Sequence, residues 1–250
     1  MKPIKVAVVG DYDPVFPPQA TLGTALRHAA AVLDLEVTET WIPTETLAKP
    51  NSSPMLQDFD GIFGGPGDVH ELEGTLQGIR FARENDKPYF GTCAGFQYAV
   101  IEFARNVLKI ADATSAEFDP SAPRLMLTPF ACNIAGEKMT VNIQPNSLAH
   151  DLYGNNVAVE EYFCHFGINP LYRNAFIEAG MQISGTDQDG EPRIFELPTH
   201  PFFLASLFVP QTSSTPAKPH PLISGFLAVC AVIASKNGLT TALHRNAPKF

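Results

Sequence analysis

The chain has 250 residues, 45% of them hydrophobic and 17% charged, which is enough material for one large globular domain or two small ones. Its 17 Lys and Arg against 26 Asp and Glu give a net charge of −9, and no segment concentrates basic residues, so nucleic acid is not an expected partner. The longest apolar stretch, 222–234, is shorter than the ~20 residues of a membrane span, and the first ten residues are too short for a secretory signal. We expect a soluble, cytoplasmic protein without membrane contact.

Four cysteines are present, and none forms a C-x-x-C pair. Their spacing does not suggest a disulfide framework, so the sequence predicts reduced thiols. Any of them that is activated is a candidate nucleophile. They are Cys93, Cys132, Cys164 and Cys230.

The first half of the chain alternates strand and helix patterns. Residues 4–10 form a β-branched run that ends in Gly, an apolar helical period follows, and short buried runs then alternate with a further helical pattern. This series predicts a parallel sheet with helices on both faces. The predicted strands are 4–10, 35–41, 59–63 and 88–91, and the predicted helices are 22–35, 71–85 and 96–108.

The pattern changes after Pro120, where short alternating segments are separated by turns. We expect antiparallel strands added to the first sheet, then a loop at 210–221, a last apolar helix at 222–235 and a frayed tail at 237–250. No linker divides the chain, so residues 1–250 are predicted to form a single domain. The predicted added strands are 124–128, 138–143, 158–166, 182–187, 193–197 and 202–209.

The segment Gly91-Thr-Cys93-Ala-Gly95, between a strand and a helix, has the form of a nucleophile elbow with Cys in the place of Ser. The flanking glycines allow a sharp turn, and the following helix directs its N-terminus at the thiol, where it favours a thiolate. A small buried Cys in a glycine turn is the alternative interpretation of this segment alone.

The elbow extends to Gly-Thr-Cys-Ala-Gly-Phe-Gln (91–97), and three further motifs accompany it: Phe-Ala-Arg-Glu-Asn (81–85), Ile-Glu-Phe-Ala-Arg (101–105) and Thr-Ser-Ala-Glu-Phe (114–118). Together they closely resemble the glutamine amidotransferase domain of CTP synthases, a class I amidotransferase, from residue 6 to about residue 226. The resemblance implies a three-layer, flavodoxin-like α/β fold and a Cys-His-Glu triad enzyme that hydrolyses glutamine and passes ammonia to a synthetase domain. It implies neither a cofactor nor a metal.

Residue roles follow from the resemblance. Cys93 is the implied nucleophile, Ala94 and Gly65 supply the oxyanion-hole N–H groups, and Gly67 belongs to the same glycine loop. The implied contacts to the glutamine head come from Gln97 and Glu117.

The family's triad His and Glu have no counterpart by this alignment. Between the flanking segments 196–201 and 214–222, the two triad positions are Val209 and Gln211. His200 is followed by Pro, as the family His is, but about nine residues of strand at roughly 3.3 Å each would place it at the opposite end of the sheet from the elbow. We therefore interpret His200 as a turn residue and expect no ordinary glutaminase activity, since losing one triad member costs on the order of 10³ to 10⁶ in rate.

The chain contains no P-loop sequence, so it is not expected to contain a synthetase domain or to make CTP by itself. The resemblance extends to stand-alone bacterial proteins described as related to the C-terminal region of CTP synthase, some of which are selenoproteins. Where CTP synthases carry a His- and Arg-rich strand near the glutamine carboxylate, this chain has Tyr162, Cys164 and His165. Our hypothesis is that Cys164 or His165 faces Cys93 and acts as a redox partner or a substitute base; a buried Cys beside a core His is the alternative.

Other candidates are weaker. Asp68, His70, Glu71 and Glu73 could bind a metal, but a solvated helix start is the favoured interpretation. The remaining apolar candidates are predicted to pack in the core: Cys132, Cys230, Phe202, Phe203 and Phe208.

Three functions remain open. The first is a hydrolase or transferase that uses Cys93 on a small amide or amino-acid-like substrate. The second is a non-catalytic module that binds a glutamine-like ligand through Gln97 and Glu117, and the third is a thiol redox protein using Cys93 and Cys164. The expected partner is a small molecule, and a homodimer or a separate partner protein remains open.

Overall fold

The computed structural model describes residues 3–132 and 134–245, with side chains up to residue 236, and this part of the chain forms a nine-stranded sheet and a separate three-stranded sheet. The N-terminal strands lie side by side and parallel at one end of the large sheet, as predicted. In spatial order they are β2 (Val37–Ile42), β1 (Ile4–Val9), β3 (Gly61–Gly64) and β4 (Tyr89–Thr92), followed by β12 (Phe203–Ser206).

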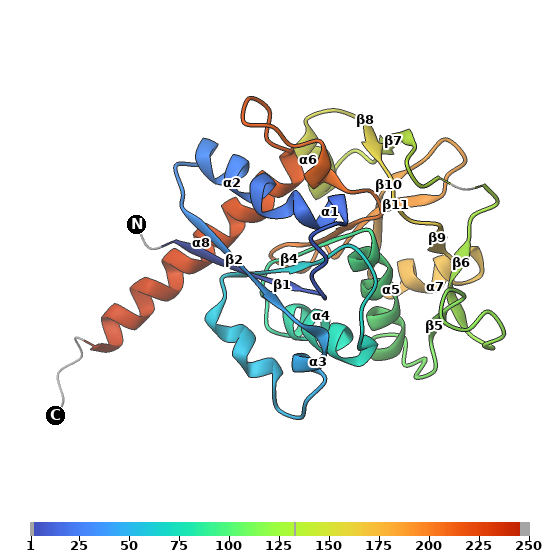
Figure 1. Cartoon of the computed structure of the whole chain (residues 1–250), viewed down its shortest axis with the longest axis horizontal. Helices are drawn as coiled ribbons and strands as arrows, with labels where there is room; N and C mark the ends of the chain where they lie inside the picture. Colours follow the sequence, from blue (N-terminus) through green and yellow to red (C-terminus); the bar gives the residue numbers. More distant parts are fainter. Residues whose placement is uncertain (1–2, 133, 246–250) are drawn as a thin grey trace.

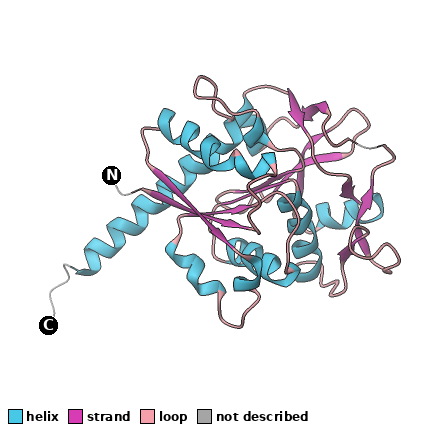
Figure 2. Cartoon of the chain, in the orientation of Figure 1, coloured by secondary structure: helices cyan, strands magenta, loops and turns pink. Residues whose placement is uncertain are grey.

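Helices cover both faces of this parallel region (Figures 1 and 2), which confirms the three-layer α/β fold. On one face α2 (Leu22–Val32), which follows the short α1 (Pro17–Ala20), packs against α8 (Pro221–Arg245). The other face carries α3 (Thr44–Leu47), α4 (Leu72–Glu84) and α5 (Ala94–Asn106). The predicted helices and strands of this half agree with the structure to within about two residues at most ends.

The second half departs from the prediction in three places. The strand predicted at 124–128 lies outside the large sheet: β6 (Leu125–Pro129) pairs with β5 (Thr114–Ser115) and β9 (Phe166–Ile168) instead. The predicted strand 158–166 ends early as β8 (Val157–Glu161), and residues 162–165 form a connection to β9. The third difference concerns β12, which was predicted as an antiparallel strand. It pairs in parallel with β4 and antiparallel with β11.

The large sheet is completed by antiparallel strands, which extend it from β12 through β11 (Pro192–Glu196), β10 (Gln182–Thr186) and β7 (Lys138–Ile143) to β8. The short helices α6 (Leu148–Tyr153) and α7 (Arg173–Glu178) connect these strands.

The core lies between the sheet and its two helical layers. Phe63, Phe90, Phe202 and Phe226 are fully buried and contact one another through their rings, which joins β3 and β4 to α8. Phe202, Phe203 and Phe208 are buried as predicted. Helix α8 continues past the predicted end of the last helix to Arg245, where a frayed tail was expected, and 246–250 lie outside the described residues. None of the helices in the described part of the chain has the length and apolar character required to cross a membrane.

Candidate active site

The elbow predicted around Cys93 is present where β4 ends and α5 begins. Cys93 has φ 54° and ψ −110°, a left-handed conformation that a residue with a side chain adopts only under constraint. Its N–H donates to the Ser206 carbonyl of β12 at 2.9 Å, so the turn is held by a neighbouring strand. The thiol therefore lies at the carboxyl edge of the parallel strands, where open α/β sheets bind ligands.

Close packing behind the elbow explains why a glycine follows it. A Cβ on Gly95 would collide with the Gly64 carbonyl of β3, so helix α5 can approach the sheet only with Gly at this position. Because α5 is thirteen residues long and begins at Ala94, its N-terminal N–H groups and dipole stabilise negative charge beside Cys93.

A disulfide joins Cys93 to Cys164, with the two Cα atoms 6.0 Å apart. The prediction of four reduced thiols is therefore wrong for this pair, whereas the hypothesis that Cys164 faces Cys93 is confirmed. Cys164 lies in the connection between β8 and β9, so the alternation of a strand does not apply there and the neighbouring His165 reaches the same cavity. Both cysteines are nearly buried, with 4% and 5% of their surface exposed.

The disulfide lines a cavity of about 480 Å³. The predicted site residues that contribute to its wall are Cys93, Ala94, Cys164, His165, Gly67, Gln97 and Glu117. The cavity also includes residues that sequence reasoning missed or interpreted otherwise: Asp11, Tyr12, Asp13, Phe16, Gln19, Asp68, His70, Tyr98 and Phe163.

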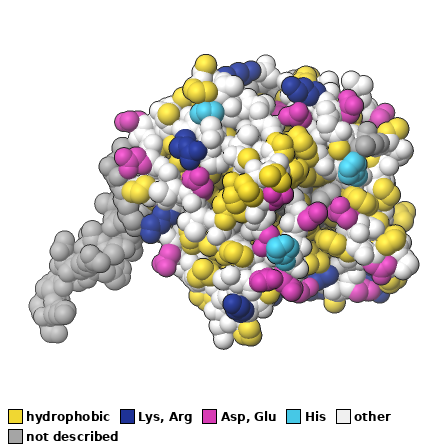
Figure 3. All heavy atoms as spheres, in the orientation of Figure 1, with side chains coloured by type: hydrophobic (Ala, Val, Ile, Leu, Met, Phe, Trp, Pro, Cys, Tyr) yellow, Lys and Arg dark blue, Asp and Glu magenta, His cyan; other side chains and the backbone are white. Residues whose placement is uncertain are grey.

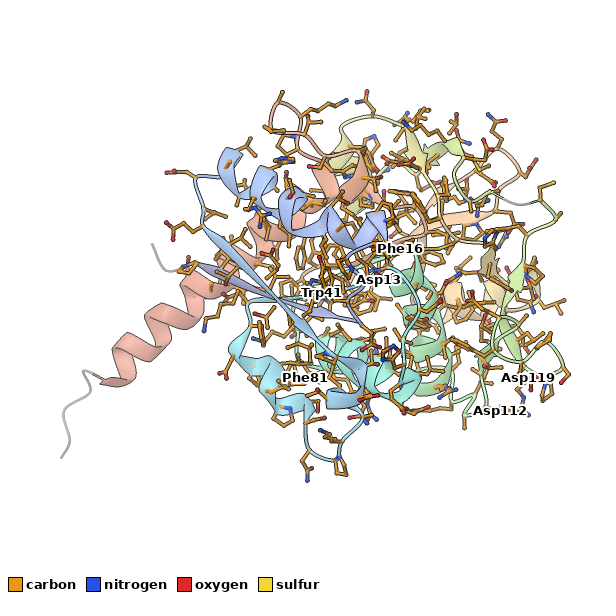
Figure 4. All side chains as sticks on the ribbon, viewed as in Figure 1. Asp13, Phe16, Trp41, Phe81, Asp112 and Asp119 are labelled. Atoms are coloured by element: carbon orange, nitrogen blue, oxygen red, sulfur yellow. A yellow bond between two sulfur atoms is a disulfide. The ribbon has the colours of Figure 1, made fainter. Side chains whose placement is uncertain are left out.

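The loop after β1 contributes most of the residues that were missed. In Figure 4 Asp13 and Phe16 lie near the middle of the molecule. The Phe16 ring contacts the Phe163 ring edge-on at 5.9 Å, which brings this loop against the segment that carries Cys164. The signal was available, since β1 and β4 are parallel and the loops after their carboxyl ends must meet at one edge of the sheet.

Gln97 and Glu117 both line the cavity. A hydrogen bond holds the Gln97 side chain, whereas burial and neighbouring charges affect the pKa of Glu117. Gln97 is buried, and its Nε2 donates to the Phe166 carbonyl at 3.1 Å, which fixes the side chain beside the Cys164 segment. Burial raises the pKa of Glu117, the nearby Asp68 carboxylate raises it further, and His165 acts in the opposite direction.

The glycine loop differs from the implied oxyanion arrangement. Gly65 donates its N–H to the Val9 carbonyl at the end of β1, at 3.0 Å. This N–H is therefore not free to bind an oxyanion, which corrects the assignment of Gly65 to the oxyanion hole. Gly67, with φ +95°, is the glycine of this loop that lines the cavity.

Gln211 lies beside the elbow, and neither Gln211 nor Val209 belongs to the cavity wall. Val209 is fully buried, and its N–H donates to the Glu161 carbonyl at 3.0 Å. Gln211 is 2% exposed, and its Nε2 donates to Thr92 Oγ1 at 3.2 Å, next to Cys93 in the chain. His200 precedes β12 at the opposite edge of the sheet, where its Nε2 lies 3.1 Å from the Ala82 carbonyl, in agreement with the prediction of a turn residue.

The remaining candidates separate into surface and core. Glu71 precedes α4 and Glu73 pairs with Arg105, whereas Asp68 and His70 line the cavity. No set of three or more metal-ligating side chains occurs within the described residues. Cys230 is buried as predicted and burial raises its pKa, but Cys132 is exposed, which corrects its assignment to the core.

The sequence comparison identifies the class. Residues 19–229 match the family described as Glutamine amidotransferase class-I, and the chain belongs to this family. Among curated relatives, it is 38% identical over 252 residues to the CTP synthase of a Cyanothece species and 35% identical over 254 residues to that of Rubrobacter xylanophilus. These alignments cover 95% and 96% of this chain but 46% and 45% of the relatives, so the chain spans less than half of their length.

A solved structure supports the same relationship. The glutaminase domain of the Trypanosoma brucei CTP synthase, with bound acivicin, aligns with a TM-score of 0.85 and 29% identity over 91% of this chain and 94% of that one. A glutamine amidotransferase from Thermotoga maritima shares the fold, with a TM-score of 0.54 at 10% identity over 92% of this chain and 97% of that one.

Proposed function

We propose that this protein is a thiol-dependent member of the class I glutamine amidotransferase family that exchanges disulfides with small molecules through Cys93 and Cys164. The observation that carries the proposal is the disulfide between these two residues in the wall of a cavity of about 480 Å³. A cavity of this size admits a small thiol or disulfide and not a folded protein domain.

The exchange is balanced by two small thiols. A thiolate attacks the Cys164 sulfur, the bond between Cys164 and Cys93 breaks, and Cys93 leaves as a thiolate stabilised by the N-terminus of α5. A second thiolate then displaces Cys164 from the mixed disulfide, and both cysteines end as thiols after taking up the two protons. Two thiols thus become one disulfide, and the protein gains two electrons and two protons.

Two observations argue against glutamine hydrolysis by the family mechanism. The positions aligned with the triad His and Glu are Val209 and Gln211, and neither side chain can remove or return a proton. The histidines of the cavity wall in the described part of the chain, His70 and His165, are exposed. We infer that the family's base has been lost and that Cys93 no longer works as a conventional glutaminase nucleophile.

A second candidate is amide hydrolysis or transfer by the reduced protein. Gln97 and Glu117 keep positions on the cavity wall that the family resemblance assigns to the glutamine head, and His165 would be the substitute base. The same contacts also suit a module that binds an amino-acid-like ligand without turnover. The hydrolase or transferase needs Cys93 as a free thiol, and the binding module needs no thiol chemistry. Disulfide exchange differs from both because it uses the bond between Cys93 and Cys164.

The test uses oxidised Cys132→Ser protein, which removes the exposed thiol. We expect 2-mercaptoethanol to open the disulfide, with two new protein thiols and one equivalent of small-molecule disulfide per chain by mass spectrometry. In Cys164→Ser protein, a small disulfide should leave a stable adduct on Cys93, because the resolving thiol is absent. A disulfide that no small thiol opens in the folded protein would contradict the proposal.

A parallel assay of the reduced protein with glutamine and a panel of amides distinguishes the hydrolase from the binding module. Ammonia release together with an acyl adduct on Cys93 would establish the hydrolase. Calorimetric binding that persists in Cys93→Ala protein, without turnover, would establish the binding module. We expect the protein to work in the cytoplasm, where small thiols are the available class of reductant.

A further inference from the structure

The cavity around the disulfide is strongly acidic. Asp11, Asp13, Asp68 and Glu117 line it, and no Lys or Arg does so among the residues whose side chains are described. Figure 3 shows several acidic side chains and a histidine among hydrophobic ones near the middle of the face viewed, with basic side chains mostly toward the edges. A wall of this charge favours a cation and repels a carboxylate.

Asp11 is held as a fixed negative charge in this wall. Burial would raise its pKa, but hydrogen bonds outweigh burial and the pKa of Asp11 is lowered. The His70 N–H donates to its Oδ2 at 2.7 Å, and Thr44 donates its N–H to Oδ1 at 3.0 Å and its hydroxyl to Oδ2 at 2.6 Å. The carboxylate is thus ionised at neutral pH and cannot turn away from the cavity.

Asp68 and Glu117 both line this space, and repulsion by the Asp68 carboxylate adds to burial in raising the pKa of Glu117. A bound cation would be attracted to both carboxylates and would offset this repulsion. The nearby His165 acts to lower the pKa of Glu117, and its side chain is exposed.

Tyr98 adds an independent indication of a polar ligand. Its side chain lines the cavity and is only 3% exposed. Burial raises the pKa of Tyr98, and Glu117, Asp68 and Asp11 raise it further, so the hydroxyl stays protonated. A protonated hydroxyl in this wall can donate a hydrogen bond to a ligand atom or a water molecule in the cavity.

We infer that the thiols and disulfides that react with Cys93 and Cys164 carry a positively charged amino group and no carboxylate, that is, that they belong to the aminothiol class. This inference rests on the proposed disulfide exchange and adds its substrate. An ammonium group would lie among Asp68, Glu117 and the Tyr98 hydroxyl while the sulfur reaches the disulfide. Thiols that carry carboxylates, including amino-acid and peptide thiols, would meet the same wall as anions.

The experiment compares three small thiols of different charge on oxidised Cys132→Ser protein: cysteamine, 2-mercaptoethanol and 3-mercaptopropionate. Each rate of disulfide opening is divided by the rate of the same thiol with hydroxyethyl disulfide, which removes differences in intrinsic thiol reactivity. At low salt we expect cysteamine to be fastest and mercaptopropionate slowest, with a spread of about tenfold or more, because each carboxylate ~7 Å away changes the rate by about threefold. Added salt should reduce the spread.

Matched variants locate the effect. Asp68→Asn and Glu117→Gln should each lower the preference for cysteamine by about threefold. Asp119→Asn, two residues from Glu117 and absent from the cavity wall, should leave it unchanged. Equal normalised rates for the three thiols would overturn the aminothiol inference and leave disulfide exchange intact, whereas failure of all three to open the disulfide would overturn the proposed function itself.

Discussion

Gln211 lies next to the elbow that carries Cys93. Gln211 is buried and donates to Thr92 Oγ1 and to the Pro18 carbonyl, so it is held as a neutral amide next to the elbow. A Glu in its place would bury a charge, and without an imidazolium at position 209 that charge would have no partner. A neutral amide at position 211 therefore fits a chain that has Val at position 209.

An imidazole placed at position 209 should change the reactivity of Cys93. In Cys164→Ser protein, where Cys93 is a free thiol, we predict that Val209→His with Gln211→Glu raises the rate of iodoacetamide alkylation of Cys93 at pH 6 by about tenfold or more. The physical reason is that an adjacent imidazole stabilises the thiolate. The measurement is adduct formation on Cys93 by mass spectrometry, with ammonia release from glutamine as a second readout.

The control for this prediction is Gln211→Glu alone, which supplies no base and should not accelerate alkylation. A folded double variant whose Cys93 reacts no faster than that of the Cys164→Ser parent would show that position 209 does not face the thiol. The alignment with the family triad would then be wrong.

At the residue scale, the elbow was predictable because two glycines flank Cys93 at a boundary between strand and helix patterns. The disulfide was only a hypothesis, since β8 ends before Cys164 and the alternation rule fails in the connection that follows. The acidic wall was missed although a parallel sheet was predicted, because the local pattern does not encode that β1 lies beside β3, and this order brings the loop with Asp11 and Asp13 near Cys93.

The two helices next to the site are joined by a buried ion pair. Arg83 of α4 donates from Nε and Nη2 to the carboxylate of Glu102 on α5, which is fully buried. Burial lowers the pKa of Arg83, but Glu102 outweighs this and the pKa is raised, so the guanidinium stays charged. This pair fixes α5, and with it the helix N-terminus that faces Cys93.

Breaking this pair should be costly. We predict that Arg83→Ala lowers the free energy of unfolding by about 3–5 kcal/mol, because it leaves the Glu102 carboxylate buried without a partner. Arg80→Ala is the matched control, since Arg80 lies on the same helix and pairs with Glu84 at the surface, where the expected loss is below ~1 kcal/mol. Urea denaturation followed by circular dichroism measures both, and equal losses for the two variants would contradict the prediction.

At the element scale, the parallel half was predicted closely because its buried strands alternate with amphipathic helices. For these segments the hydrophobic periodicity and the segment length indicate the same type of element. The second half was predicted less well. Short alternating segments fit any antiparallel partner, so nothing local to residues 124–128 or 166–168 indicates that β6 and β9 leave the large sheet and form a smaller one.

At the scale of the whole molecule, the disulfide joins the two halves of the fold across the cavity. Cys93 lies on the parallel half at the start of α5, and Cys164 lies between the outermost strand of the large sheet and the small sheet. The cross-link closes a loop of 71 residues that contains every element from α5 to β8. Its redox state should therefore affect the stability of the whole chain as well as the availability of Cys93.

We predict that reduction lowers the free energy of unfolding by about 2–4 kcal/mol, because the unfolded chain regains the conformational freedom of that loop. For a protein of this size the loss corresponds to a decrease in Tm of roughly 5–15 °C. The measurement is thermal unfolding of Cys132→Ser protein with and without a non-ionic reductant. The control is the same protein with Cys93→Ser and Cys164→Ser added, whose Tm should not respond to the reductant and should lie near that of the reduced parent. If the oxidised and reduced parents unfold at the same temperature, the disulfide does not restrain the two halves in solution, and Cys93 would have to be treated as a free thiol in every mechanism considered for the cavity.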